Sequence, residues 1–393
     1  MSAAADVAPV DEATPGDSGA LARRARWSDA GLFAVLLALA LLLALALASA
    51  LLAVADASPA TVFDAIIDGS LGSAPALATT LNHTSLILVV AAGTCIAFRA
   101  GMVNIGQEGQ LSIGGLTATA VALGLPFAGP WAVVIILLAG AAGGAIWAVA
   151  PAFLRFRRGV SEVVTTLLLN FVAFQAVSYA VNQPRLLQED VRADSVTAPS
   201  PQSNRLPDDD MLPALSSGTG YRLHVGIVIA VVLALAVGFL IRRTTLGFRL
   251  RVFGFNPRAA RRLDVKPGVM GGGALIASAA FAGLAGAVLL TGVTMRLQGG
   301  FSSGVYGSFS NNFGWEGLVV ALVATYDPVY AIPVGFLFGA LRAGSGALTA
   351  TGISPTIAAV VQALVLIAVT VPALLIVQRR RRREVQALRR ERI

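Results

Sequence analysis

Residues 31–55 read GLFAVLLALALLLALALASALLAVA, an apolar stretch that contains no charged side chain. An α-helix rises about 1.5 Å per residue, so a helix of this length exceeds the roughly 30 Å thickness of the bilayer hydrocarbon. Ala48-Ser49-Ala50 resembles a signal-peptide cleavage site, but the stretch is longer than the roughly 7–15 apolar residues of a signal peptide. We therefore expect this stretch to be retained as the first membrane-spanning helix.

The composition of the whole chain supports a membrane protein. Hydrophobic residues make up 56% of the 393 residues and charged residues only 13%, and the mean hydropathy is +0.76. A soluble domain has about 45–50% apolar and about 25% charged residues. Because a chain of this size cannot bury all of its apolar side chains in a core, we expect many of them to contact lipid.

Further apolar stretches follow the first one along the chain. They lie at about 84–98, 110–125, 131–150, 161–181, 223–241, 269–292, 313–326, 329–348 and 355–377. Some are short or interrupted by glycine. The pattern predicts an all-α polytopic membrane protein with about ten transmembrane or partly re-entrant helices, in a transmembrane domain of residues 30–377.

The distribution of charge predicts the orientation in the membrane. Most of the 29 basic residues lie in segments that fall on one side of the expected spans. The positive-inside rule makes this side cytoplasmic, together with both chain termini. We expect a disordered cytoplasmic tail at 1–29, an irregular, proline-containing extracytoplasmic loop at 182–222, a cytoplasmic loop at 242–268 and a basic cytoplasmic tail at 378–393. The basic residues then set the orientation of the chain and contact anionic membrane lipid, which explains the net positive charge of the protein. We therefore expect no nucleic acid partner.

Two glycine-rich segments share the pattern N-x-G-x-E-G, at residues 104–109 and 312–317. Both precede an apolar helix, and five expected helices separate them. An odd number of intervening spans inverts the second segment relative to the first. The sequence thus predicts an inverted internal repeat, a common way to build a transport pathway from broken helices.

The carboxylates of these segments are the first candidates for a translocation pathway. A carboxylate inside a membrane costs free energy unless it is paired or hydrated, so Glu108 and Glu316 are expected to contact substrate, to gate, or to stabilise neighbouring helices. Glu162 follows Ser161 at a predicted helix start. Ser161 is expected to be the N-cap residue, and the carboxylate of Glu162 to interact favourably with the helix dipole. The candidate pathway or gating residues are Asn104, Gln107, Glu108, Glu162, Asn170, Asn312, Trp315 and Glu316.

The predicted cytoplasmic loop contains a helix start of its own. Asn256 precedes Pro257, an N-cap residue followed by proline at the first helical position. A short, basic, alanine-rich helix should follow. Such an exposed helix serves either as a docking element or as a lipid-lying segment.

Three motifs in this order resemble a known family. They are NIGQEGQ at 104–110, GVSEVVTTLLLNFVA at 159–173 and GFNPRAA at 254–260. The chain is similar to the permease subunits of bacterial ATP-binding-cassette (ABC) importers for simple sugars and nucleosides, within the branched-chain amino acid and ribose permease superfamily. The nucleoside branch, whose members work with basic membrane lipoproteins, is the nearest.

The resemblance implies a bacterial plasma (inner) membrane location and several partners. They are an ABC ATPase subunit, a second permease subunit and an extracytoplasmic substrate-binding lipoprotein that delivers a small-molecule substrate. The loop helix is then expected to dock on the ATPase and to transmit its closure. The ATPase-coupling residues implied are Gly254, Asn256, Pro257, Ala259, Ala260 and Arg261.

The residues themselves argue against chemistry within this chain. A P-loop requires a lysine before serine or threonine, whereas the sole lysine, Lys266, precedes Pro267. ATP and Mg²⁺ are therefore expected on the partner ATPase. With Cys95 as the sole cysteine and His83 and His224 as the only histidines, we expect neither a bound cofactor nor a metal site.

Three alternatives remain open from the sequence. A permease for simple sugars such as ribose or galactose would have the same architecture. An ion-driven secondary transporter would use Glu108 and Glu316 to carry protons. An intramembrane enzyme is disfavoured because neither histidine has an H-E-x-x-H or a G-x-S-x-G arrangement around it.

Overall fold

The computed structural model describes residues 59–190, 201–262, 264–302, 305–307 and 309–350, together with scattered positions within 35–50 and 360–379. The chain divides into two compact units, one of residues 1–51 and 363–393 and one of residues 52–362. The second unit contains nearly all of the described residues. The expected first and last spans and both terminal tails fall largely outside the described residues, so they stay predictions.

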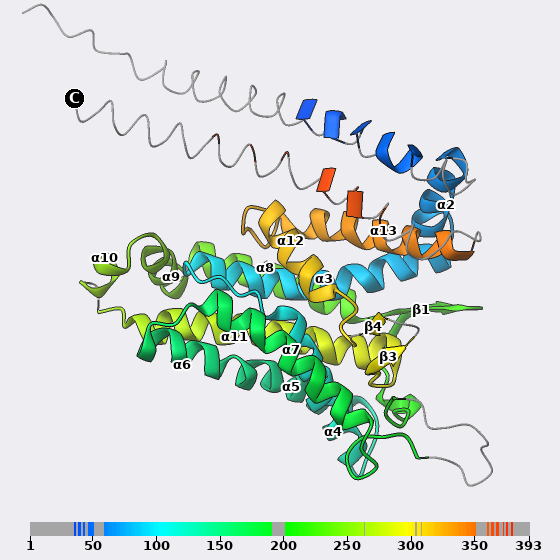
Figure 1. Cartoon of the computed structure of the whole chain (residues 1–393), viewed down its shortest axis with the longest axis horizontal. Coiled ribbons are helices and arrows are strands. Elements are labelled where there is room, and N and C mark those ends of the chain that lie inside the picture. Colours follow the sequence, from blue (N-terminus) through cyan, green and yellow to red (C-terminus); the bar gives the residue numbers. More distant parts are fainter. Residues whose placement is uncertain are drawn as a thin grey trace, which may run out of the picture. The chain divides into compact units, whose positions relative to one another are not determined.

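Helices build almost the whole of the second unit (Figure 1). The helices are α2 (Pro59–Leu71), α3 (Ala74–Arg99), α4 (Gln107–Gly124), α5 (Pro130–Trp147), α6 (Val149–Arg158), α7 (Glu162–Val181), α8 (Gly226–Arg243), α9 (Thr245–Phe255), α10 (Pro257–Arg261), α11 (Pro267–Leu289), α12 (Phe313–Val323) and α13 (Ala331–Ala350). A π-helical turn, Leu290–Thr294, extends α11. The described residues also form a 3-10 turn, Asp208–Asp210, and two short hairpins: β1 (Ala214–Gly218) with β2 (Tyr221–His224), and β3 (Gly300–Ser302) with β4 (Val305–Gly307).

Six helical stretches among the described residues are long and apolar enough to cross a bilayer. They are Ala74–Arg99, Pro130–Arg158, Glu162–Val181, Gly226–Arg243, Pro267–Thr294 and Ala331–Leu348. Each coincides with an apolar stretch of the sequence, as expected of a mostly helical protein with several membrane-spanning helices. The helix α12 is different, because its 11 residues extend only about 16 Å and cannot cross about 30 Å of hydrocarbon.

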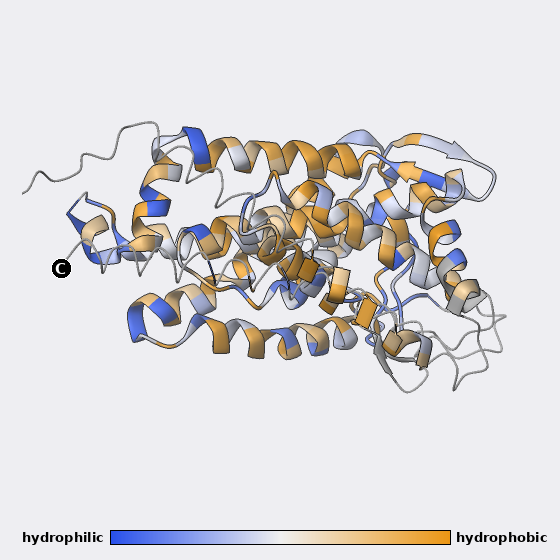
Figure 2. Ribbon diagram, turned by 90° about the horizontal axis from the view of Figure 1, so that it is seen from above, coloured by the Kyte–Doolittle hydropathy of each residue, from blue (hydrophilic) through white to orange (hydrophobic). Residues whose placement is uncertain are grey.

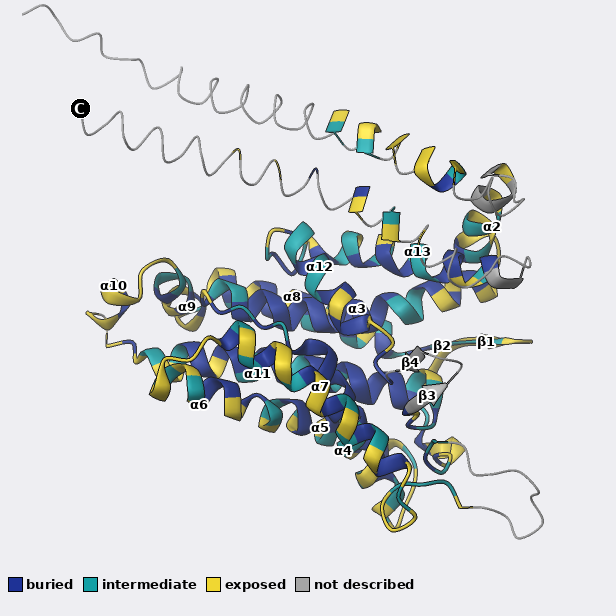
Figure 3. Ribbon diagram, viewed as in Figure 1, coloured by how far each residue is buried: buried dark blue, intermediate teal, exposed yellow. Residues whose placement is uncertain are grey.

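Burial distinguishes the central helices from the peripheral ones. The span formed by α3 is 78% buried inside the unit, whereas those formed by α7 and α8 are 28% and 33% buried (Figure 3). The exposed side chains of α7 and α8 include large apolar ones such as Phe171 and Phe239. Figure 2 shows hydrophobic residues along most of the length of the long helices. Apolar side chains on the outside of the bundle are those that lipid would cover.

The helices α4, α5 and α11 pack backbone against backbone. A Cβ atom added at Gly283 of α11 would lie 2.2 Å from the Gly140 carbonyl oxygen and 2.9 Å from the Gly144 Cα atom of α5. Small residues at helix crossings permit this close approach, which supplies van der Waals contact where lipid provides no hydrophobic driving force. A Cβ atom added at Gly114 of α4 would likewise lie 2.3 Å from the Gly283 Cα atom. These contacts place α11 beside both α5 and α4, and the first turn of α4 carries the N-x-G-x-E-G glutamate.

The connections gather at the two ends of the bundle. The helices α9 and α10 lie at one end and the hairpins lie at the other, here called the hairpin end (Figure 1). The expected irregular loop at 182–222 contains β1 and the start of β2, whose last residue is His224, so that expectation is corrected in part. The physical reason is the placement of proline: the prolines of this loop all precede Ala214, and proline interrupts strand pairing only where it occurs.

Residues 201–206 of this loop run beside residues 295–299, which follow α11. Ser203 N donates to the Leu297 carbonyl at 2.8 Å, and Gly299 N donates to the Pro201 carbonyl at 3.0 Å. Leu297 N in turn donates to Ser203 Oγ at 3.0 Å. The loop is therefore fastened to the end of a central helix.

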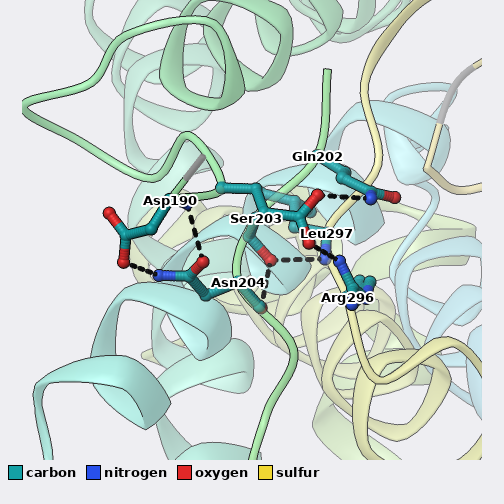
Figure 4. Close-up of polar contacts among 7 residues, drawn as sticks. Asp190, Gln202, Ser203, Asn204, Arg296 and Leu297 are labelled. Carbon is teal, nitrogen blue, oxygen red and sulfur yellow. Dashed lines mark hydrogen bonds and ion pairs between the residues drawn. The ribbon is translucent and has the colours of Figure 1, made fainter. Parts of the chain in front are cut away.

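The carboxylate of Glu189 adds a charged link to this contact, and its strength is expected to depend on pH. Gln202 Nε2 donates to it at 2.6 Å and Arg296 forms an ion pair with it (Figure 4). The hydrogen bond from Gln202, followed by that from Arg296, lowers the pKa of Glu189 below its usual value of 4.5. The folded loop favours the charged form, so the link is complete above about pH 4.5 and is lost as the pH falls through the lowered pKa.

At pH 7 we expect Glu189→Gln to increase hydrogen exchange at residues 201–206 and 295–299 relative to the unsubstituted protein. The difference should shrink as both proteins are compared at progressively lower pH, because the native carboxylate becomes protonated. Asp209→Asn, an exposed change in the same loop, is the control and should have no effect. Equal exchange of Glu189→Gln and the unsubstituted protein at pH 7 would show that the link does not hold the loop.

Candidate functional site

The first N-x-G-x-E-G segment lies at a break between two buried helices. Residues 102–106, between α3 and α4, are not helical. Asn104 is fully buried there. Its amide nitrogen donates to Gln110 Oε1 at 2.8 Å and to Ser278 Oγ at 3.1 Å, which ties the break to α4 and α11. Backbone outside a helix is tolerated in a membrane only where protein or water satisfies it, and Asn104 contributes to this.

Asn170 of α7 satisfies two more backbone groups at the same break. Its Oδ1 accepts from Gly109 N at 2.9 Å, and its Nδ2 donates to the Ile105 carbonyl at 3.0 Å. One turn earlier, Thr166 Oγ1 accepts from Ile105 N at 3.2 Å. The helix α7 therefore supports the first turn of α4 through side chains that are almost fully buried.

Glu108 points away from this cluster and reaches the second N-x-G-x-E-G segment. One carboxylate oxygen, Oε1, accepts from Asn312 N at 2.8 Å and from Ser310 Oγ. The other oxygen, Oε2, accepts from Trp315 N at 3.2 Å. The carboxylate thus lies at the N-terminus of α12, where the helix dipole and the unpaired N–H groups favour a negative charge. The glutamate of the first segment caps the helix of the second.

Glu316, the glutamate of the second segment, has a cation as its partner. Arg342 Nη1 of α13 lies 2.6 Å from Glu316 Oε1, and both side chains are nearly buried. Arg342 Nη2 donates to the Asn311 carbonyl at 2.6 Å. The guanidinium also lies 3.9 Å from the centre of the Phe313 ring, a favourable cation–π contact. Arg342 therefore binds both Asn311, two residues before α12, and the first turn of α12.

The remaining predicted pathway residues divide into neighbours of this site and outliers. Gln107 is buried beside Glu108, and its Nε2 donates to Thr94 Oγ1 of α3. The side chains of Asn312 and Trp315 are exposed, so these residues contribute their backbone N–H groups rather than a buried side chain. The structure thus gathers Asn104, Gln107, Glu108 and Asn170 around the break before α4, and brings Glu108 against the start of α12.

Glu162 lies apart from these residues. It forms an ion pair with Arg155 of α6 at 3.0 Å, across the connection between α6 and α7. Ser161 occupies the N-cap position of α7, but its side chain makes no capping hydrogen bond. The expected serine cap is therefore wrong, and the ion pair with Arg155, together with the helix dipole, accounts for Glu162.

Several residues of the site had no assigned role in the sequence, among them Thr166, Ser310 and Arg342. Arg342 is a charged residue within an apolar stretch, a signal that marks functional or structural sites in membranes. Thr166 lies one helical turn before Asn170 on the same face of α7, a spacing that the sequence contains. Ser310 carries no such signal, because only the fold brings it to Glu108.

The helix start predicted at Asn256 is confirmed. Asn256 Oδ1 accepts from Arg258 N at 3.0 Å and from Ala259 N at 3.2 Å, and Pro257 is the first residue of α10. In this segment Ala260 is buried, whereas Ala259 and Arg261 are exposed. Phe255, directly before the cap, is 90% exposed. An exposed aromatic beside a capped basic helix is an apolar contact surface at this end of the bundle.

Gly254 connects this surface to the end of α3. A Cβ atom at Gly254 would lie 2.3 Å from the Arg99 carbonyl oxygen and 3.0 Å from Gly101 N. Only glycine permits the two backbones to approach so closely. The helix α9 is therefore in direct backbone contact with the C-terminus of α3.

Comparison with known proteins agrees with this architecture. Residues 76–370 match the family described as branched-chain amino acid transport system / permease component. The chain is similar to a guanosine ABC transporter permease protein of Bacillus subtilis, with 31% identity over 301 residues, which cover 75% of this chain and 80% of the relative.

Two further relatives have similar coverage. A glucose ABC transporter permease protein of Haloferax volcanii is 28% identical over 80% of this chain and 81% of its own length. A nucleoside ABC transporter permease protein of Lactococcus lactis is 25% identical over 80% of this chain and 84% of its own length. These similarities, with the family match over most of the sequence, confirm the resemblance found in the motifs: the chain belongs to the family of branched-chain amino acid transport system permease components.

Proposed function

We propose that this chain is the membrane-spanning permease subunit of an ABC importer for nucleosides. The observation that carries the proposal is its similarity, over three quarters or more of its length, to permeases whose names specify guanosine and nucleosides. The matched region also covers about four fifths of each relative, so the similarity is not confined to a shared fragment.

The importer is a complex in which this chain supplies the pathway and its partners supply energy and substrate. An ABC ATPase binds ATP and Mg²⁺, a second permease completes the pathway, and an extracytoplasmic binding protein delivers the substrate. The lack of a P-loop lysine in this chain supports the division of labour. The coupling surface consists of Gly254, Asn256, Pro257, Ala259, Ala260 and Arg261.

The topology we propose has the α9–α10 end of the bundle in the cytoplasm and the hairpin end outside. The eight basic residues within 242–268 support this orientation through the positive-inside rule. The transmembrane domain has about ten membrane helices and contains an inverted repeat, in which α4 corresponds to α12. The direct contact of Glu108 with the start of α12 supports this correspondence, because pseudo-symmetric halves meet at the pathway in such transporters.

The pathway is proposed to pass beside the two N-x-G-x-E-G segments. Broken helices with satisfied polar groups are the elements from which transport sites are built at membrane depth. Glu108 holds the N–H groups of α12, and Glu316 holds Arg342. These engagements favour a gating role for both carboxylates over the carriage of protons, and thus favour ATP over an ion gradient as the energy source.

A second candidate substrate class is simple sugars, because one relative is a glucose permease. Nucleosides and sugars share hydroxyl groups, and the nucleobase is the distinguishing part. Proteoliposomes that contain this permease with its ATPase and binding protein will separate the two classes.

We expect these proteoliposomes to import labelled guanosine only when ATP is present on the side of the membrane that carries the ATPase. Excess unlabelled nucleoside should abolish the import of the label. Excess glucose or ribose should leave it unchanged. Import of sugar but not guanosine would move the chain to the sugar class. Import that continues without ATP but stops when the proton gradient is collapsed would contradict the ABC mechanism.

A further inference from the structure

The short helix α12 is bounded on both sides by residues in the left-handed backbone region. Asn311 and Asn312 precede it with φ values of 44° and 68°, and Thr325 and Tyr326 follow it with φ values of 53° and 58°. Among the described residues only two other non-glycine residues, Asp264 and Met295, have positive φ. Such conformations persist where surrounding contacts impose them, and they cluster at switch regions.

The N-terminal side of α12 is held by charged side chains from two other helices. Glu108 of α4 accepts from Asn312 N, and Arg342 of α13 donates to the Asn311 carbonyl. Each of the two left-handed residues on this side is therefore bound through its backbone. At its middle, α12 crosses α3 at Gly317, where an added Cβ atom would lie 2.5 Å from Val90 Cβ.

The C-terminal side of α12 is held by the last residues of α3. Arg99 Nε donates to the Tyr326 carbonyl at 3.0 Å. The rings of Phe98 and Tyr326 stack with their centres 4.2 Å apart and their planes 16° from parallel. Together these contacts fix the left-handed turn that follows α12 to the end of α3.

A second clamp on this side comes from α8. Arg242 forms an ion pair with Asp327, the residue after the left-handed turn. Asp327 Oδ1 also accepts from Val329 N at 3.0 Å, so the same carboxylate organises the turn into α13. The side chain of Asp327 is nearly buried, whereas that of Arg242 is about half exposed.

Both clamps are joined directly to α9, and α9 leads into α10. The carbonyl of Arg99 is the atom against which Gly254 of α9 packs. Arg242 lies in the last turn of α8, and Thr244, two residues later, caps α9 by accepting from Gly247 N at 3.1 Å. Because these connections are backbone contacts and one short turn, a displacement of α9 moves both arginines.

We propose that α12 is a rocking half-helix that carries the motion of the α9–α10 segment to Glu108, with Arg99, Arg242 and Asp327 as its positioning residues. The α9–α10 segment moves Arg99 and Arg242. These residues shift the C-terminal end of α12 about its crossing with α3, and the N-terminal end then changes its position against Glu108. The proposal rests on the proposed function, since it requires a partner that moves α9 and α10.

The experiment measures the number of ATP molecules hydrolysed per guanosine molecule imported by the complex in proteoliposomes. Arg242→Gln removes the charge that holds Asp327. Asp327→Asn removes the ion pair but keeps an oxygen for Val329 N, so the turn retains its cap. In both variants we expect this ratio to rise about tenfold, within the range of measured coupling between sites, while ATP hydrolysis continues.

Arg243→Gln is the matched control, because Arg243 is exposed, lies beside Arg242 and forms none of the ion pairs found among the described residues. It should hydrolyse and import as the unsubstituted complex does. The proposal is overturned if Arg242→Gln and Asp327→Asn both leave the number of ATP molecules hydrolysed per imported guanosine unchanged. This holds if both activities stay intact and also if hydrolysis and import fall by the same factor. Failure of the proposed function would be seen already in the unsubstituted complex, whereas failure of the relay is seen only in the variants.

Discussion

Glu108→Ala is expected to lower nucleoside import more than about a hundredfold. The substitution removes the carboxylate that accepts from Ser310 Oγ, Asn312 N and Trp315 N, and it leaves these donors without this acceptor in a buried place. A hydrogen bond to a charged group contributes about 1.5–3 kcal/mol, so the loss of these bonds together costs about 3 kcal/mol or more, which is a little more than a hundredfold in an equilibrium constant. Import by proteoliposomes gives the direct measurement.

Glu108→Gln tests whether the charge or the shape matters. Glutamine keeps one acceptor oxygen but places an NH₂ group against a backbone N–H group, so we expect import between that of Glu108→Ala and that of the native protein. Ser112→Ala is the control, because Ser112 lies one turn later on α4, is equally buried and donates only to the Glu108 carbonyl of its own helix. It should import normally. Import by Glu108→Ala at the native rate would show that Glu108 has no role in the pathway or in gating.

Gly254→Ala should have the second largest effect. The added methyl group would meet the Arg99 carbonyl oxygen at 2.3 Å and Gly101 N at 3.0 Å, and these are backbone atoms that cannot rotate away. Overpacking of this kind costs about 1–3 kcal/mol, which corresponds to about 5–150-fold in coupling. We expect ATP-driven import to fall by a factor in that range while the protein still enters the membrane.

Gly268→Ala is the matched control at the same end of the bundle. A Cβ atom there would make ordinary contact with Phe156 at 3.8 Å, so import should be unchanged. Binding of the ATPase to both variants, measured by co-purification, separates loss of docking from loss of coupling. If Gly254→Ala imports as well as Gly268→Ala, the contact between α9 and α3 has no part in coupling.

Apolar periodicity and length were sufficient to identify the membrane helices. Stretches such as 161–181 and 269–292 are apolar over enough residues that only a lipid-spanning helix satisfies their backbone. The start of α10 was equally predictable, because Asn256 and Pro257 act on backbone groups within three residues of themselves. The β1–β2 hairpin was missed because its short strands have polar sequences without a strong alternating pattern.

The sequence predicted several residues of the candidate site but not the contacts between them. The repeated N-x-G-x-E-G pattern singled out Glu108 and Glu316, and both are buried and engaged. Glu162 was selected instead as a charged residue at the start of an apolar stretch, and its partner is Arg155 on the neighbouring helix, outside the site. A buried carboxylate needs a partner, but the sequence does not specify which one.

The sequence by itself determined that this chain spans a membrane, where its long apolar helices lie and which carboxylates must be satisfied inside it. These properties follow from local free energies, namely the cost of exposing backbone or charge to lipid. Only the tertiary structure decided that Glu108 caps α12. In this cap Glu108 accepts from Asn312 N, which lies 204 residues later in the sequence. That contact depends on how α3, α4 and α12 pack, and packing arises from many contacts between distant residues that leave no local pattern in the sequence.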